Sequence, residues 1–189
     1  MSKPISTKTK EQPENHLDEK EAKWFAVYTH YKREKIATKQ LDLAGIKVYL
    51  PLQKLTRRYV RKVKKVELPL INHYIFVKIT KKEYASIFHC PYVLNFVKFN
   101  KNLISIPEAE IELLKRILGE SEAVELDSIS LNKGDLVEVI GGNLTGLKGI
   151  LIQKENNKYL SVQLTNIGVS LNISIATHLL RKIKNGVLV

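Results

Sequence analysis

The last third of the chain alternates short apolar strands with glycine and asparagine turns, and this pattern restricts the fold more than any other feature. Four segments of strand character follow one another within about 60 residues, and in the last of them apolar side chains occupy every second position. The predicted strands are Leu136–Ile140, Gly149–Lys154, Tyr159–Leu164 and Val169–Ile175. Because an open sheet of this size would expose its edges, we expect a small closed β-barrel over residues 129–189.

Residues 23–119 mix helix and strand patterns instead. Aromatic and β-branched strands are predicted at Trp24–Tyr28, Ile46–Leu50, Tyr74–Ile79 and Val93–Phe99. A first amphipathic helix is predicted over 32–44, with one apolar face made by Ile36, Ala37, Leu41 and Ala44. A second helix is predicted to follow Ser105, which with Glu108 has the spacing of a capping box, and a short helix is predicted over 81–89. This order predicts an α+β fold: an antiparallel sheet flanked by helices, followed by the small barrel.

A strongly basic segment joins the second and third predicted strands. Between Lys54 and Lys65 lie seven basic side chains and no acidic one. Tyr59, Val60 and Val63 interrupt this run, which favours an extended hairpin arm over a loose tail. The whole chain has 31 Lys+Arg against 19 Asp+Glu, a formal charge of +12, and a field of this sign raises the affinity for nucleic acid. The alternative, a solvated lysine-rich surface, stays open from the sequence alone.

Two segments lack an apolar pattern. Residues 1–22 are almost entirely polar and cannot bury enough surface to offset their ordering entropy, so we expect a disordered tail there. Residues 120–128 carry four acidic side chains without strong periodicity and are predicted to be a linker. The expected domains are therefore residues 23–119 and residues 129–189.

The composition excludes several classes of protein. No apolar run approaches the ~20 residues that cross a bilayer, and the first 22 residues lack the apolar core of a secretory signal, so we expect no membrane partner. The single cysteine, Cys90, excludes an intramolecular disulfide. These features together predict a reduced, cytoplasmic compartment.

No catalytic or metal-binding constellation stands out in the sequence. The five histidines are scattered, and there is neither a His-Glu-x-x-His run nor a Cys-x-x-Cys pair. The glycines at 142, 146 and 149 are not followed by the Gly-Lys-Ser/Thr of a phosphate-binding loop, so they are read as turn glycines. We expect no enzyme activity, no metal and no cofactor.

Two segments resemble the domains of one family of transcription factors. The C-terminal glycine spacing resembles the KOW motif of NusG-type factors and some ribosomal proteins, through Gly134, Asp135, Val137, Val139, Gly142, Gly146 and Gly149. Physically, Val137 and Val139 are expected to face the barrel core, while the glycines allow tight turns. Trp24-Phe25-x-Val27-Tyr28 and the segment from Pro69 to Val77 are similar to the NGN domain of NusG and RfaH. The resemblance covers roughly residues 23–183.

The chain also departs from the family pattern. Where the family commonly reads Phe-Pro-Gly/Asn, this chain has Ile71-Asn72-His73, and the Pro-Phe of the barrel loop is Asn143-Leu144. Together with the basic arm, these departures favour a specialised paralog, similar to the UpxY-like antiterminators of polysaccharide operons.

The resemblance implies a role in transcription elongation. An NGN domain is expected to dock on the clamp helices of RNA polymerase and to oppose pausing or termination. The expected docking residues are Tyr28, Ile71, His73, Tyr74 and Phe96, although Tyr28 and Phe96 fit the core equally well. Contacts to non-template or upstream DNA are expected from His30, Lys32, Arg33 and Lys39, and from Arg57, Arg58, Arg61 and Lys62 of the arm.

The expected partners do not end with polymerase and DNA. The KOW barrel is expected to recruit a ribosomal protein or Rho, and the protein is expected to be a monomer. An RNA-binding ribosomal or ribosome-assembly protein is the alternative: it explains the charge and the barrel but leaves the N-terminal pattern unexplained.

Overall fold

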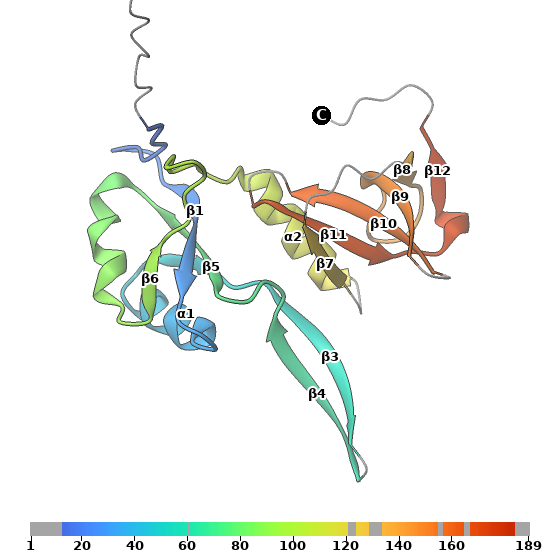
Figure 1. Cartoon of the computed structure of the whole chain (residues 1–189), viewed down its shortest axis with the longest axis horizontal. Helices are drawn as coiled ribbons and strands as arrows, with labels where there is room; N and C mark the ends of the chain where they lie inside the picture. The colour runs from blue at the N-terminus through green and yellow to red at the C-terminus, as the bar shows by residue number, and fades with distance from the viewer. Residues whose placement is uncertain are drawn as a thin grey trace, which may run out of the picture.

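The computed structural model describes residues 13–59, 61–120, 124–128, 134–154, 157–164 and 167–183. Within these ranges the chain forms two antiparallel sheets and a separate two-stranded ribbon (Figure 1). Helices combine with these antiparallel sheets, which confirms the predicted α+β class. None of the helices in these ranges is long and apolar enough to cross a membrane.

The first sheet has the strand order β2-β5-β1-β6 and is apolar on both faces. Its strands are β1 (Lys23–Thr29), β2 (Lys47–Tyr49), β5 (Tyr74–Ile79) and β6 (Val93–Phe96). Phe25, Val27 and Ile75 belong to one buried cluster together with residues of helix α1 (Glu34–Leu43). On the opposite face, Trp24 and Phe76 belong to a second cluster, which includes residues of helix α2 (Glu108–Glu120).

Helix α1 begins two residues later than predicted. Lys32 has a positive φ of 55°, which a helix cannot contain, so the helix starts after Arg33. Ala37 and Leu41 are buried as expected, but Ile36 is 40% exposed and Glu34 takes the remaining buried place. The predicted apolar face is therefore only half right.

Helix α2 lacks the predicted capping box. The Glu108 carboxylate accepts hydrogen bonds from the Trp24 indole N–H (2.9 Å) and from Lys78 Nζ (2.6 Å) instead of turning back to Ser105. The bond from Lys78 is the main cause that lowers the pKa of Glu108. The periodicity of the sequence predicts an apolar face made by Ile111, Leu114 and Leu118; in the structure Ile111, Leu114 and Ile117 are buried, and Leu118 is only partly buried.

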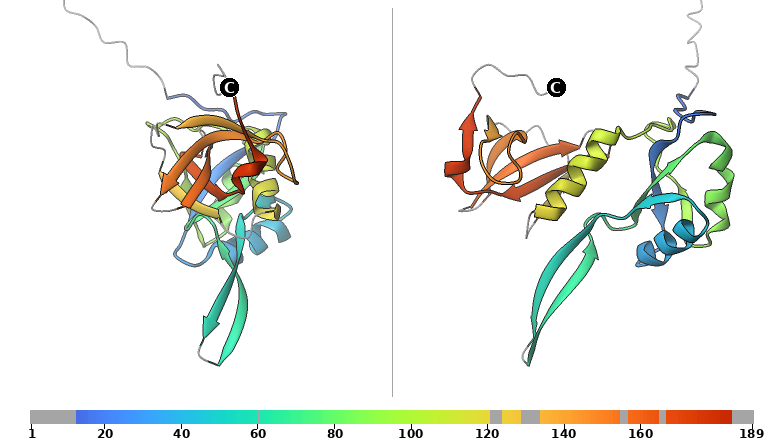
Figure 2. Two further views of the ribbon diagram at one scale, coloured as in Figure 1. Left: turned by 90° about the vertical axis from the view of Figure 1, so that its right-hand side faces the viewer. Right: turned by 180° about the vertical axis from the view of Figure 1, so that it is seen from behind.

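The second sheet is built from the C-terminal strands in the order β12-β8-β9-β10-β11-β7, and it curls on itself (Figure 2). The strands are β7 (Val124–Ser128), β8 (Asp135–Val139), β9 (Lys148–Lys154), β10 (Asn157–Leu164), β11 (Val169–Ser174) and β12 (Leu180–Lys182). The four predicted strands are confirmed, whereas β7 and β12 at the two ends of the ladder were not predicted. Apolar residues of β10 and β11, such as Leu160 and Leu171, are fully buried in its core.

The predicted linker is wrong, because it contains a strand. Helix α2 runs to Glu120, and β7 pairs with β11 from Val124↔Ile173 to Val169↔Ser128. Val124 is only 5% exposed, so this strand is anchored in the core. The C-terminal sheet therefore starts at residue 124, and residues 121–123 lie outside the described ranges.

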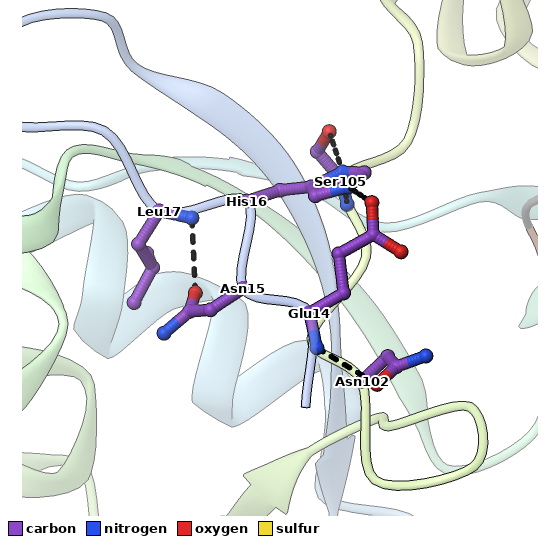
Figure 3. A network of polar contacts seen from close by, with 6 residues as sticks. All are labelled: Glu14, Asn15, His16, Leu17, Asn102 and Ser105. Atoms are coloured by element: carbon purple, nitrogen blue, oxygen red, sulfur yellow. Dashed lines mark hydrogen bonds and ion pairs between the residues drawn. The ribbon is translucent and has the colours of Figure 1, made fainter. Parts of the chain in front are cut away.

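The predicted disordered tail is wrong over residues 13–22 (Figure 3). The Glu14 N–H donates to Asn102 Oδ1 (2.9 Å), and Asn15 forms a β-bridge with Leu103. His16 Nδ1 accepts from the Ser105 N–H (3.1 Å), while His16 Nε2 lies 2.7 Å from a Glu14 carboxylate oxygen. Polar contacts hold this segment in place. The sequence-based argument considered only the burial of apolar residues, so it did not predict this order. Residues 1–12 of the predicted tail lie outside the described residues.

Helix α2 lies between the two sheets and joins them (Figure 2). The Arg116 guanidinium donates to the carbonyl oxygens of Asn143 (2.8 Å) and Thr145 (2.6 Å), in the loop that follows β8. Leu144, between them, is buried in the same cluster as Ile117 of the helix. The KOW-like loop therefore contacts α2 and buries Leu144 there, while Gly142, Asn143, Thr145 and Gly146 stay exposed.

Candidate functional site

Four aromatic side chains gather at one end of the first sheet, where β1 ends and β5 begins. This aromatic patch consists of Tyr28, Tyr31, His73 and Tyr74. Tyr28 and Tyr74 are register partners, with ring centroids 4.7 Å apart, and the Tyr74 hydroxyl donates to the Tyr28 hydroxyl (2.8 Å). The Tyr31 ring lies 5.5 Å from the His73 ring. Tyr28 is 37% and Tyr31 66% exposed, so the patch is open to a partner.

A tight turn fixes the position of the patch. His73 has a positive φ of 67°, and its carbonyl accepts a hydrogen bond from the Thr29 N–H (2.8 Å). The His73 N–H donates to a carboxylate oxygen of Glu34 (2.8 Å), which is only 4% exposed. A buried carboxylate needs such a donor, so Glu34 ties the turn to helix α1. The patch is therefore preorganised.

The patch is aromatic and polar without carrying negative charge of its own. Partial burial, followed by the hydrogen bond to Tyr28, raises the pKa of Tyr74. The Tyr74 phenol is neutral at physiological pH, as an unperturbed tyrosine also is, and it is a hydrogen-bond donor.

Cationic side chains border the aromatic patch. The Lys32 Nζ lies 4.8 Å from the centroid of the Tyr31 ring, and the Arg33 guanidinium lies 5.8 Å from that of Tyr92. His30 is exposed beside them, and Lys39 is exposed further along α1. All four predicted DNA-contacting residues of this region are exposed. Three of them, at positions 30, 32 and 33, flank Tyr31 of the patch in the sequence.

Two of the predicted docking residues are buried. Ile71 is 7% exposed and belongs to the cluster that includes Leu70, Phe76 and helix α2. Phe96 is 2% exposed, and its ring stacks on that of Tyr84 at a centroid distance of 4.7 Å. The turn before Tyr74 breaks the strand alternation and directs Ile71 inward. Neither side chain is available to a partner in this conformation, which corrects the sequence-based prediction.

The basic segment forms the predicted hairpin arm. Strands β3 (Leu52–Tyr59) and β4 (Lys62–Pro69) pair from Leu52↔Pro69 to Tyr59↔Lys62 and project away from both sheets (Figure 1). At the base, the Leu70 N–H donates to the Pro51 carbonyl (2.8 Å), and Lys35 Nζ of α1 donates to the Glu67 carbonyl (2.8 Å). The first bond joins the two ends of the arm at its base, and the second ties the arm to α1.

Within the described part of the chain, no cation of the arm is paired with a carboxylate. All seven are exposed: Lys54, Arg57, Arg58, Arg61, Lys62, Lys64 and Lys65. Among the residues that the structure describes, none of their charged groups lies within ion-pair distance of an acidic side chain. The arm is therefore a concentrated positive charge that is free to meet a polyanion.

The KOW-like residues have the expected structural roles. Val137 and Val139 are 3% and 1% exposed in the core. Gly142 and Gly146 have positive φ values of 75° and 83°, as turn glycines do. Asp135 pairs with Lys182 (2.6 Å), which ties β8 to β12, and Gly134 and Gly149 leave room for neighbouring strands.

Sequence reasoning missed Tyr31 and Glu34. Tyr31 lies three residues after the predicted strand and directly precedes two basic residues, a pattern that marks an exposed aromatic. Glu34 gives no such signal, because its burial depends on the distant turn at His73. No group of three or more His, Cys, Asp or Glu side chains suited to a metal occurs among the described residues.

Comparison with known proteins identifies related sequences and folds. A family model described as transcription termination factor nusG matches residues 22–115. A solved structure reported as "Domain interaction in Thermotoga maritima NusG" is 22% identical over 86% of this chain and 98% of that chain, with a TM-score of 0.52. The MjSpt4:Spt5 complex gives 19% identity over 86% of this chain and 97% of that chain, with a TM-score of 0.30. Comparison with curated proteins gives no match.

Proposed function

Because this chain is a NusG-like transcription factor that matches the family over residues 22–115, we propose that it binds RNA polymerase and suppresses pausing or termination. The single observation that carries the proposal is the exposed, preorganised aromatic patch within the family-matched region. The fold shared with the Thermotoga protein agrees with it.

The aromatic patch is the docking surface for the clamp helices of the polymerase. Tyrosine is enriched at interface hot spots because one rigid ring combines apolar area with a hydroxyl that can bond a partner. The patch loses little conformational entropy on binding, since Tyr74 is already bonded to Tyr28 and the turn is held by Glu34. Binding energy then favours the elongating conformation of polymerase over the paused one.

Two sets of basic residues contact the nucleic acid of the elongation complex. His30, Lys32, Arg33 and Lys39 face the non-template strand beside the docking surface. The arm, through Arg57, Arg58, Arg61 and Lys62, reaches the upstream duplex. Both sets add affinity that falls as salt rises, because bound cations release counterions from phosphates.

The C-terminal sheet is a KOW domain that recruits a second partner, a ribosomal protein or Rho. Arg116 of α2 donates hydrogen bonds to Asn143 and Thr145 of the glycine loop in this domain. These bonds have to break before a partner can cover that loop. The basic arm favours a specialised paralog that acts on a particular operon, such as one for polysaccharide biosynthesis, and no bond is made or broken in its action.

Replacing Tyr74 with Ala should weaken polymerase binding by about 30-fold or more, the effect of removing a hot-spot residue worth ~2 kcal/mol. The loss follows because both the ring and the hydroxyl bonded to Tyr28 disappear from the docking surface. Affinity for purified polymerase measures it, with circular dichroism as the check on folding. Leu43→Ala is the matched control, since Leu43 is 77% exposed at the far end of α1 and should bind normally.

A folded Tyr74→Ala protein that binds polymerase as tightly as the wild type would remove the patch from the docking surface. Co-purification with ribosomal particles at fixed stoichiometry, without polymerase, would instead favour an RNA-binding ribosomal or ribosome-assembly protein.

A further inference from the structure

The register of the arm divides its cations evenly between two faces. Directly paired residues of an antiparallel ribbon share a face, and successive residues of a strand alternate. One face, named the Arg57 face, carries the pair Arg57↔Lys64 together with Lys62, two residues before Lys64. The opposite face, named the Arg58 face, carries Arg58↔Val63, Thr56↔Lys65 and Lys54↔Glu67. Each face therefore presents three positive side chains: Arg57, Lys62 and Lys64 on the first, and Lys54, Arg58 and Lys65 on the second.

Neither face is covered by the rest of the described chain. Val63, on the Arg58 face, is 65% exposed, and the paired residues Leu55 and Val66 near the base are only partly buried. An arm that lay flat on a charged surface would need cations on one face only. Cations on both faces instead match a partner that presents negative charge on both sides of the arm, as a groove between two negatively charged walls does.

The dimensions of the arm select the kind of groove. Eight residues per strand extend for about 26 Å at ~3.3 Å per residue, and a sheet with its side chains is about 10 Å thick. The major groove of B-form DNA, ~12 Å wide and ~8.5 Å deep between two phosphate backbones, admits a two-stranded ribbon. The major groove of A-form RNA is too narrow for one.

We propose that the arm enters the major groove of duplex DNA edge-on, so that the Arg57 face contacts one phosphate wall and the Arg58 face the other. Arg61 lies in the turn at the tip of the arm. This inference deepens the proposed function, on which it rests, by naming the upstream ligand as B-form duplex and fixing how it is gripped.

Two triple variants of the full chain test the two-walled contact on a mixed-sequence DNA duplex. They are Arg57→Ala/Lys62→Ala/Lys64→Ala and Lys54→Ala/Arg58→Ala/Lys65→Ala. If every cation meets a phosphate, the slope of log K against log salt falls by about 0.9 for each, and so by about 2.7 in either variant. The matched control is Lys82→Ala/Lys98→Ala/Lys101→Ala, which removes three exposed cations outside the arm and should leave the slope unchanged.

A second measurement locates the groove. The wild type should protect guanine N7, which lies in the major groove, from methylation by dimethyl sulfate, and each arm variant should lose that protection.

Several results would overturn the inference: a slope that falls in only one arm variant, an equal fall in the control, unprotected guanines, equal binding to duplex RNA, or no binding to duplex DNA at all. Polymerase binding by the same proteins is measured in parallel. Polymerase binding without DNA binding would sink the groove contact alone, whereas DNA binding without polymerase binding would sink the proposed function alone.

Discussion

Replacing Ile71 with Asp should unfold the packing between the first sheet and helix α2. Ile71 is 7% exposed in the cluster that holds Leu70, Phe76 and Ile111. A carboxylate at this position would lose its hydration without gaining a partner, and the apolar contacts of the isoleucine would be lost as well. We expect the free energy of unfolding to fall by about 3–5 kcal/mol, measured by denaturant titration.

The next residue supplies the control. Asn72 is exposed on the same turn, so Asn72→Asp introduces the same charge without burying it and should change stability by no more than ~0.5 kcal/mol. An Ile71→Asp protein as stable as the wild type would show that the side chain is free at the surface. The docking role expected from the sequence would then return.

Replacing Gly149 with Ala should destabilise the C-terminal sheet by about 3 kcal/mol, since inserted atoms in a packed site force the backbone to shift. A Cβ on Gly149 would lie 2.5 Å from the Ser161 carbonyl oxygen and 2.9 Å from Leu160 Cδ1. The carbonyl cannot move away freely, because Ser161 pairs with Ile150 in the β9–β10 ladder. The thermal unfolding of the variant measures the loss.

Two other glycines calibrate this effect. A Cβ on Gly119, in helix α2, meets nothing within 4 Å, so Gly119→Ala should be neutral or stabilising by up to ~1 kcal/mol. Gly146 also has open space but a φ of 83°, so Gly146→Ala should cost about 1–2 kcal/mol from backbone strain alone. If Gly149→Ala cost no more than Gly146→Ala, close approach of the strands would not be what requires glycine at 149.

Strong local periodicity explains which parts of the fold could be predicted. Strands β10 and β11 alternate apolar and polar residues, and this alternation identified buried apolar positions such as Leu160 and Leu171. It did not predict that Ser161, Ser170 and Asn172 between them are buried too. Strand β7 has the same alternation in its sequence, and its register pairs Val124 with Ile173 and Leu126 with Leu171, but its acidic residues suggested a linker. Residues 13–22 were misjudged for another reason: their attachment depends on individual hydrogen bonds, such as that of His16 to Ser105, and these have no periodic signature.

Residues of the candidate site could be predicted where their position depends on neighbours in the sequence, and not where it depends on contacts with distant segments. Tyr28 and Tyr74 were found because the motif places them together, and the arm was found because valines interrupt its charges. The inward direction of Ile71 depends on the turn at His73, whose positive φ breaks the alternation of the strand. The division of the arm's cations between two faces depends on the pairing register, which the tip of the hairpin fixes.

The most direct test of the account is a transcription assay with purified RNA polymerase on a template that carries a defined pause site. The full chain should bind the elongation complex and shorten the pause, and the folded Tyr74→Ala protein should do neither at the same concentration, while Leu43→Ala acts like the wild type. A correctly folded wild-type protein that neither binds the elongation complex nor changes the duration of the pause would contradict the proposed function.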